Sequence, residues 1–299
     1  MALPTASTAN RPLTGALWML VTGVLFVCVT AAVKHGARDL PAPEAAFLRF
    51  AFGVVLTFPG ILAVTRHHMN RDMAVLFATR GAIHAVGVML WFYAMTRITV
   101  AEVTAMNYLN PIFVTIGAAL ILGERVARRR QIAIAIAFLG ALVILRPGFR
   151  QIDSGHVAML GTALALGGSY LIAKALADRA PAGEVVGMMS LAVTVFLLPV
   201  AIAVWRTPTL VETGWMFLVA VLASLGHYTM TRAFASAPVT VTQPISFLQL
   251  IWATAVGFLL FGEAIDPYVI SGGLMILGAA AFITIREAIL ARARQDRPT

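Results

Sequence analysis

Residues 13–33, LTGALWMLVTGVLFVCVTAAV, form an apolar run of 21 residues that contains no charged side chain. A helix that crosses a membrane needs about 20 such residues, so this run predicts a transmembrane span. The same character extends over the whole chain, because 60% of its 299 residues are hydrophobic and only 12% are charged. Soluble domains carry about 25% charged residues. The composition therefore predicts an all-α integral membrane protein and excludes an ordinary soluble enzyme.

Nine further apolar segments follow the first one, and the breaks between them are short and rich in proline, glycine or charge. The ten predicted spans are residues 13–33, 44–65, 73–95, 100–122, 130–146, 156–177, 185–205, 212–234, 239–261 and 267–286. Most of the 22 Lys and Arg residues fall in or near the two terminal tails and the breaks on the same side as the tails. By the positive-inside rule, both termini are expected in the cytoplasm.

The two halves of the chain are related by a constant offset. A shift of 140 residues aligns identical residues, namely Lys34, Pro41, Ala42, Glu44 and Pro59 with Lys174, Pro181, Ala182, Glu184 and Pro199. A shift of 139 residues aligns Gly123-Glu124 with Gly262-Glu263. The sequence therefore predicts two repeats, 13–146 and 156–287, joined by a linker (147–155) and flanked by cytoplasmic tails (1–12 and 288–299). Five spans per repeat make the second repeat inverted, an arrangement that places a transport site between the repeats near the membrane midplane.

Each half resembles an EamA-type unit of the drug/metabolite transporter superfamily. The resemblance rests on Ile121-Leu122-Gly123-Glu124 and Leu260-Phe261-Gly262-Glu263, which end the fourth span of each half, and on Pro43 and Arg49 in the second span. Within the superfamily the chain is most similar to bacterial aromatic amino acid/paraquat exporters. This resemblance implies a secondary transporter of the inner (plasma) membrane that exports aromatic and other neutral amino acids by alternating access.

Paired polar side chains occur at repeat-related positions of the fourth and ninth spans. Asn107 and Asn110 lie one helical turn apart, and the offset of 139 maps them onto Ser246 and Gln249. Polar side chains inside a membrane are expensive to bury, so each pair needs a function. We interpret the four residues as a neutral polar site for the ammonium and carboxylate groups of a zwitterion. The alternative is that they make interhelical hydrogen bonds.

Other candidates lie in the third, eighth, first and sixth spans. Arg80, His84 and Trp91 share one face of the third span, where Arg80 either pairs with a substrate carboxylate or snorkels to the membrane interface. The repeat-related eighth span carries His227 and Tyr228, and weaker candidates are Trp18 and Tyr170. Arg49 is interpreted chiefly as an interface anchor beside Glu44, with a charge in the pathway as its alternative.

The motifs of several other protein classes are missing from the sequence. There is no Gly-rich loop followed by Lys-Ser/Thr, so we expect no ATP hydrolysis by the chain, and no spacing predicts a metal site, a cofactor site or a catalytic constellation. The expected partners are an amino acid substrate and the lipid bilayer, not nucleic acid, with a monomer favoured over a dimer. A carrier of another small metabolite or of a cationic drug is the alternative function, and an intramembrane lipid-modifying enzyme is less favoured.

Overall fold

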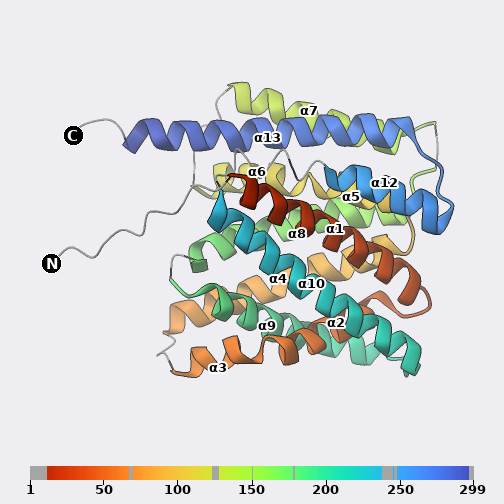
Figure 1. The fold of residues 1–299 in the computed structure, drawn as a ribbon, viewed down its shortest axis with the longest axis vertical. Coiled ribbons are helices and arrows are strands. Elements are labelled where there is room, and N and C mark those ends of the chain that lie inside the picture. The colour runs from red at the N-terminus through yellow and green to blue at the C-terminus, as the bar shows by residue number, and fades with distance from the viewer. Residues whose placement is uncertain are drawn as a thin grey trace.

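The computed structural model describes residues 12–66, 70–122, 128–149, 151–177, 179–237, 245 and 248–295. Its helices run roughly side by side across the view in Figure 1, and α13 ends toward the left of that view. The helices are α1 (Pro12–Gly36), α2 (Ala42–Leu56), α3 (Phe58–Arg66), α4 (Arg71–Met95), α5 (Val100–Asn107), α6 (Asn110–Leu122), α7 (Arg128–Leu145), α8 (Ser154–Ala177), α9 (Ala182–Ala203), α10 (Leu210–Ser236), α12 (Leu248–Phe261) and α13 (Pro267–Gln295).

Each of the ten predicted apolar segments contains helix, but the segments are not ten straight spans. Within the described residues, six helices are long and apolar enough to cross a membrane singly. A seventh crossing is formed if α2 and α3 count as one span, which is bent by 69°. The helical bundle agrees with the predicted class, while ten membrane crossings stay a prediction.

The fourth predicted span is broken, which contradicts our expectation of one helix that carries both Asn107 and Asn110. Helix α5 ends at Asn107, and α6 begins at Asn110. Pro111 explains the break, because proline has no N–H to donate to the residue 107 carbonyl and its ring collides with that carbonyl. The two asparagines therefore lie on either side of a discontinuity.

Helix contacts between the two halves occur in repeat-related sets. Helix α1 packs against α10, and α4 packs against α8. The repeat offset relates α1 to α8 and α4 to α10, so it converts the first of these pairs into the second. Helix α2 packs against α9 and α7 packs against α13, and each of these pairs maps onto itself. A two-fold relation between the halves produces this pattern.

The α7–α13 pair lies along one edge of the bundle, at the top of Figure 1. Ala133, Ala137 and Ala141 of α7 are all buried, at 4%, 0% and 3% exposure, so this small-residue stripe packs inside the chain. The backbones approach so closely that a Cβ added to Gly140 would lie 2.6 Å from the Gly272 carbonyl oxygen. The remaining helices surround the centre of the bundle.

Candidate functional site

A cavity of about 130 Å³ is enclosed by residues of α1, α2, α4, α5, α8, α10 and α12. These are the helices of the first, third, fourth, sixth, eighth and ninth segments, together with α2. We call it the central cavity.

Seven of the sequence-predicted site residues line the central cavity. They are Arg49, His84, Trp91, Asn107, Tyr170, His227 and Gln249. Four others, Trp18, Arg80, Asn110 and Tyr228, are not among its lining residues. Ser246 lies outside the described residues.

The two histidines of the central cavity are each held against a phenylalanine. The His84 ring is edge-on to Phe50, with 5.9 Å between ring centroids, and its Nδ1 lies 3.0 Å from the Ser169 hydroxyl. The His227 ring is edge-on to Phe26 at 5.3 Å. Both histidines are thus fixed by contacts with neighbouring helices, and the cavity wall combines polar and aromatic groups.

Two polar groups next to the helix break and the cavity lack full hydrogen bonding. The Asn110 side-chain N–H donates to Asn107 Oδ1 at 3.1 Å, so the two asparagines bond to each other across the break. Asn110 Oδ1 is buried without a partner, and so is the indole Nε1 of Trp91. The Trp91 N–H is therefore a donor without an acceptor in this conformation.

Arg80 is buried and bonded to groups of another helix. Its Nη1 donates to the Val185 carbonyl at 3.3 Å, and its Nη2 lies 3.2 Å from the Met189 sulfur. The side chain is 6% exposed and connects α4 to α9. Trp18, by contrast, lies near the end of α10, where its ring centroid is 5.8 Å from the Arg232 guanidinium carbon.

Arg49 does not have the surroundings of an interface anchor paired with Glu44. It is 7% exposed and lies on the wall of the central cavity, with its guanidinium carbon 3.8 Å from the centroid of the Phe50 ring. Glu44 Oε2 instead accepts a hydrogen bond from the backbone N–H of Arg206 at 2.9 Å. The structure therefore places Arg49 where the pathway alternative requires it.

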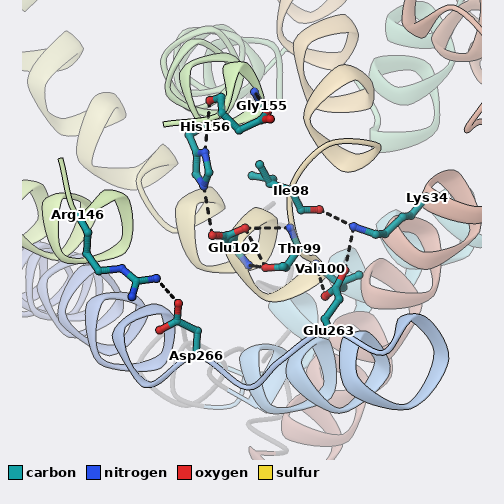
Figure 2. Close-up of polar contacts among 11 residues, drawn as sticks. Lys34, Ile98, Thr99, Val100, Glu102, Arg146, Gly155, His156, Glu263 and Asp266 are labelled. Atoms are coloured by element: carbon teal, nitrogen blue, oxygen red, sulfur yellow. Dashed lines mark hydrogen bonds and ion pairs between the residues drawn. The ribbon is translucent and has the colours of Figure 1, made fainter. Parts of the chain in front are cut away.

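A second, larger cavity of about 930 Å³ opens at the end of the bundle where α1 ends. We call it the vestibule. Many charged and titratable side chains line it, namely Lys34, His35, Arg38, Asp39, Arg97, Glu102, Asp153, His156, Glu263 and Asp266. Figure 2 shows how several of these groups are connected.

Lys34 and Glu263 join the two halves of the chain at the floor of the vestibule. Lys34 Nζ lies 2.8 Å from Glu263 Oε1 and donates to the Ile98 carbonyl at 2.6 Å. The other carboxylate oxygen of Glu263 accepts the backbone N–H of Val100 at 2.9 Å (Figure 2). The free N–H groups at a helix start favour a negative charge, so Glu263 stabilises the beginning of α5.

The Gly-Glu ending of α12 has a structural explanation. Gly262 follows the last residue of α12 and has φ of +64°, a left-handed conformation that glycine adopts without strain. The turn directs Glu263 back toward its own helix, where a Cβ on Gly257 would lie 2.3 Å from Glu263 Oε2. Gly262 therefore permits the turn after α12, and Gly257 leaves room for the Glu263 carboxylate beside the helix.

Glu102 makes a second connection at the vestibule. It forms a capping box with Thr99 at the start of α5, and its Oε1 lies 3.2 Å from His156 Nε2 of α8 (Figure 2). Both side chains are 5% exposed. Sequence reasoning did not single out Lys34, Glu102, His156 or Glu263 as site residues, although the duplicated Gly-Glu and the Lys34/Lys174 alignment pointed to two of them.

A thin layer separates the vestibule from the central cavity. Thr30 lines the central cavity and Lys34 lines the vestibule, and they are four residues apart on α1. On α5, Glu102 faces the vestibule and Thr104 the central cavity. At 1.5 Å of rise per residue, the layer on α1 is about 6 Å thick. The Lys34–Glu263 contact is part of this layer.

Comparisons with known proteins place the chain among membrane transporters. It is 29% identical to a riboflavin transporter of Rhizobium johnstonii, over 93% of each chain. It is 28% identical to a pseudopaline exporter of Pseudomonas aeruginosa, over 89% of this chain and 94% of that one. An S-adenosylmethionine uptake transporter of Rickettsia prowazekii is 23% identical over 92% and 94% of the two chains. None of these three is an aromatic amino acid exporter, so the predicted likeness to that branch is not shown.

The fold has a counterpart of known structure. A crystal structure with 18% sequence identity superposes with a TM-score of 0.59 and covers 91% of this chain and 96% of that chain. The EamA-like transporter family model matches the sequence twice, over residues 13–146 and 153–285. These matches and the relatives identify a transporter and not an enzyme. The chain belongs to the EamA-like transporter family.

Proposed function

We propose that the chain is a secondary carrier of a small organic metabolite, which binds in the central cavity and crosses the membrane by alternating access. The observation that carries this proposal is the lining of the cavity, which combines hydrogen-bonding and aromatic groups from both halves of the chain. Ligand sites are typically apolar cavities with a few well-placed polar groups. Transporters built from two repeats bind their substrates at the repeat interface.

The two cavities suggest how access alternates. The central cavity is separated from the vestibule by the layer that contains the Lys34–Glu263 contact. Passage between the two cavities therefore requires this layer to open. We propose ten crossings in two inverted five-span repeats, with both termini in the cytoplasm of a bacterial-type cell. In that topology the vestibule faces away from the cytoplasm.

Among substrate classes, a metabolite other than an amino acid is supported best. The names of the relatives mention riboflavin, pseudopaline and S-adenosylmethionine. They include both an exporter and an uptake transporter, so the direction of transport is left to experiment. Aromatic and other neutral amino acids, which the sequence resemblance implied, form the second arm of the test. A cationic drug is disfavoured because no carboxylate lines the central cavity within the described residues.

Transport by purified protein in proteoliposomes tests the proposal. Without ATP, the vesicles should show saturable counterflow of at least one compound among riboflavin, S-adenosylmethionine, phenylalanine, methionine and threonine. Trp91→Ala should reduce this flux, because the indole is part of the cavity wall. The matched control is Trp252→Ala on the exposed surface of α12, which is 39% exposed and outside the cavity. Absence of flux for every compound, or chemical change of any of them, would refute the proposal.

A further inference from the structure

The central cavity carries charge of one sign only. Its lining includes Arg49, together with His84 and His227, and within the described residues it includes no aspartate or glutamate. An arginine guanidinium stays protonated in proteins, so the cavity holds at least one fixed positive charge. Charges inside a membrane protein normally pair with an opposite charge or with backbone carbonyls. The positive charge of Arg49 therefore calls for a compensating group.

The described part of the chain offers Arg49 no anionic partner. Its side chain is 93% buried, yet it makes no ion pair and no hydrogen bond there. Its contact is the face of the Phe50 ring, at 3.8 Å. Gly53, one turn further along α2, leaves space beside it, because a Cβ added there would lie 3.8 Å from Arg49 Nη1. The guanidinium, which has five N–H donors, thus lies on the cavity wall without an acceptor among the described residues.

Two other cations of the described structure each have at least one acceptor. Arg80 has the Val185 carbonyl and the Met189 sulfur as partners, although its Nε is buried without one, and it does not line the central cavity. Lys34 has the Glu263 carboxylate and a backbone carbonyl. Arg49 differs from both because it lines the central cavity and has no acceptor at all among the described residues.

Neighbouring groups on the cavity wall add further donors. The Trp91 indole N–H is buried and has no acceptor. The side-chain oxygen of Asn107 is occupied by the Asn110 amide, which leaves the Asn107 N–H₂ group as its remaining polar group. Donors of this kind around a guanidinium complement the oxygens of an anion.

We propose that the substrate carries an anionic oxygen group, either a carboxylate or a phosphate, that Arg49 binds directly. A planar or apolar part of the same molecule contacts the rings of Phe26, Phe50 and Trp91, which line the same cavity. This inference rests on the proposed function and narrows its substrate class. A neutral or cationic molecule in the same place would leave the guanidinium without a counter-ion after its access to water is lost.

Matched pairs of compounds test the inference on the wild-type protein. One pair is riboflavin and riboflavin 5′-phosphate, and the other is 3-phenylpropanamide and 3-phenylpropanoate. Binding is measured by isothermal titration in detergent, and counterflow is measured in proteoliposomes. A hydrogen-bonded charge pair favours the anion by about tenfold or more, so the anionic member of at least one pair should bind at least tenfold more tightly. The pair that responds distinguishes phosphate from carboxylate. Equal or weaker binding of the anionic member in both pairs overturns the inference.

Variants of Arg49 provide the second measurement. Arg49→Gln should weaken binding of the preferred anion at least tenfold and leave its neutral analogue within twofold, whereas Arg49→Lys should retain part of the preference. The matched control is Arg129→Gln on α7, which is exposed and outside the central cavity and should change neither. If Arg49→Gln does not fold, the wild-type comparison decides. Transport of neutral compounds with no anion preference refutes only the anion site, whereas absence of all flux refutes the proposed function.

Discussion

Replacing Lys34 with methionine should increase the population of a state in which the layer between the vestibule and the central cavity is open. The substitution removes the 2.8 Å contact with Glu263 and the 2.6 Å hydrogen bond to the Ile98 carbonyl, while the carboxylate stays in place. Removing one partner of a fully buried ion pair costs about 3–5 kcal/mol. Here the two side chains are 18% and 11% exposed toward the vestibule, so we expect about 2 kcal/mol after screening. That free energy corresponds to a roughly 30-fold increase in the open population.

Cysteine accessibility measures this change directly. The single native cysteine, Cys28, is first replaced with serine, and Thr104 on the cavity wall is replaced with cysteine. A membrane-impermeant thiol reagent added from the vestibule side should then modify residue 104 about 30-fold faster in the Lys34→Met background. The matched control is Arg38→Met, which removes a vestibule cation that has no ion pair within the described residues.

Two further variants test whether the Lys34–Glu263 contact itself controls access. Glu263→Gln should accelerate labelling to a similar extent, and combining it with Lys34→Met should add little, because both substitutions break the same contact. An acceleration below threefold would show that the contact does not hold the layer closed. An equal acceleration in Arg38→Met would show that vestibule charge, and not the contact with Glu263, controls access.

Three other substitutions test separate parts of the structure. Asn107→Ala should lower transport while the protein remains monodisperse in detergent, and full activity would place the substrate elsewhere. Gly140→Leu should lower the melting temperature and cost more than about 1 kcal/mol, since its side chain meets the Gly272 carbonyl; an unchanged melting temperature would contradict the close packing. Glu102→Ala should lower the melting temperature more than Glu212→Ala, because both residues complete capping boxes, but Glu102 adds a contact with a buried histidine whereas Glu212 adds a more exposed ion pair with Arg206; equal effects would show that the histidine contact stabilises no more than the exposed ion pair.

The segments that surround the cavity could be predicted because polar residues inside apolar runs are visible in a sequence. Each polar side chain within a span needs a partner or a function, so residue type and depth point to His84, Trp91 and Asn107, and the repeat offset adds Gln249. All four line the central cavity. The membrane class and the helical content of the chain could also be predicted, from the hydrophobic composition and from the lengths of the apolar runs.

The contacts at the vestibule could not be predicted in this manner. A basic residue at the end of a span is already explained by topology, so nothing in the sequence around Lys34 indicated that it meets Glu263. That contact depends on the packing of α1 against the end of α12. The sequence left two interpretations of Arg49 open for a related reason. Its distance from the start of its helix fits both an anchor and a cavity residue, and its place on the cavity wall depends on how α2 is rotated in the bundle.

The contact between Val100 and Glu263 also bears on how the protein is made. The two residues are 163 positions apart, and ribosomes add about 5–20 residues per second. The start of α5 is therefore synthesised roughly 8–30 s before its acceptor. During that interval the Val100 N–H at the start of α5 lacks its acceptor, the Glu263 carboxylate. If the two halves are expressed as separate polypeptides, the first half should accordingly be stable only when the second half is also present.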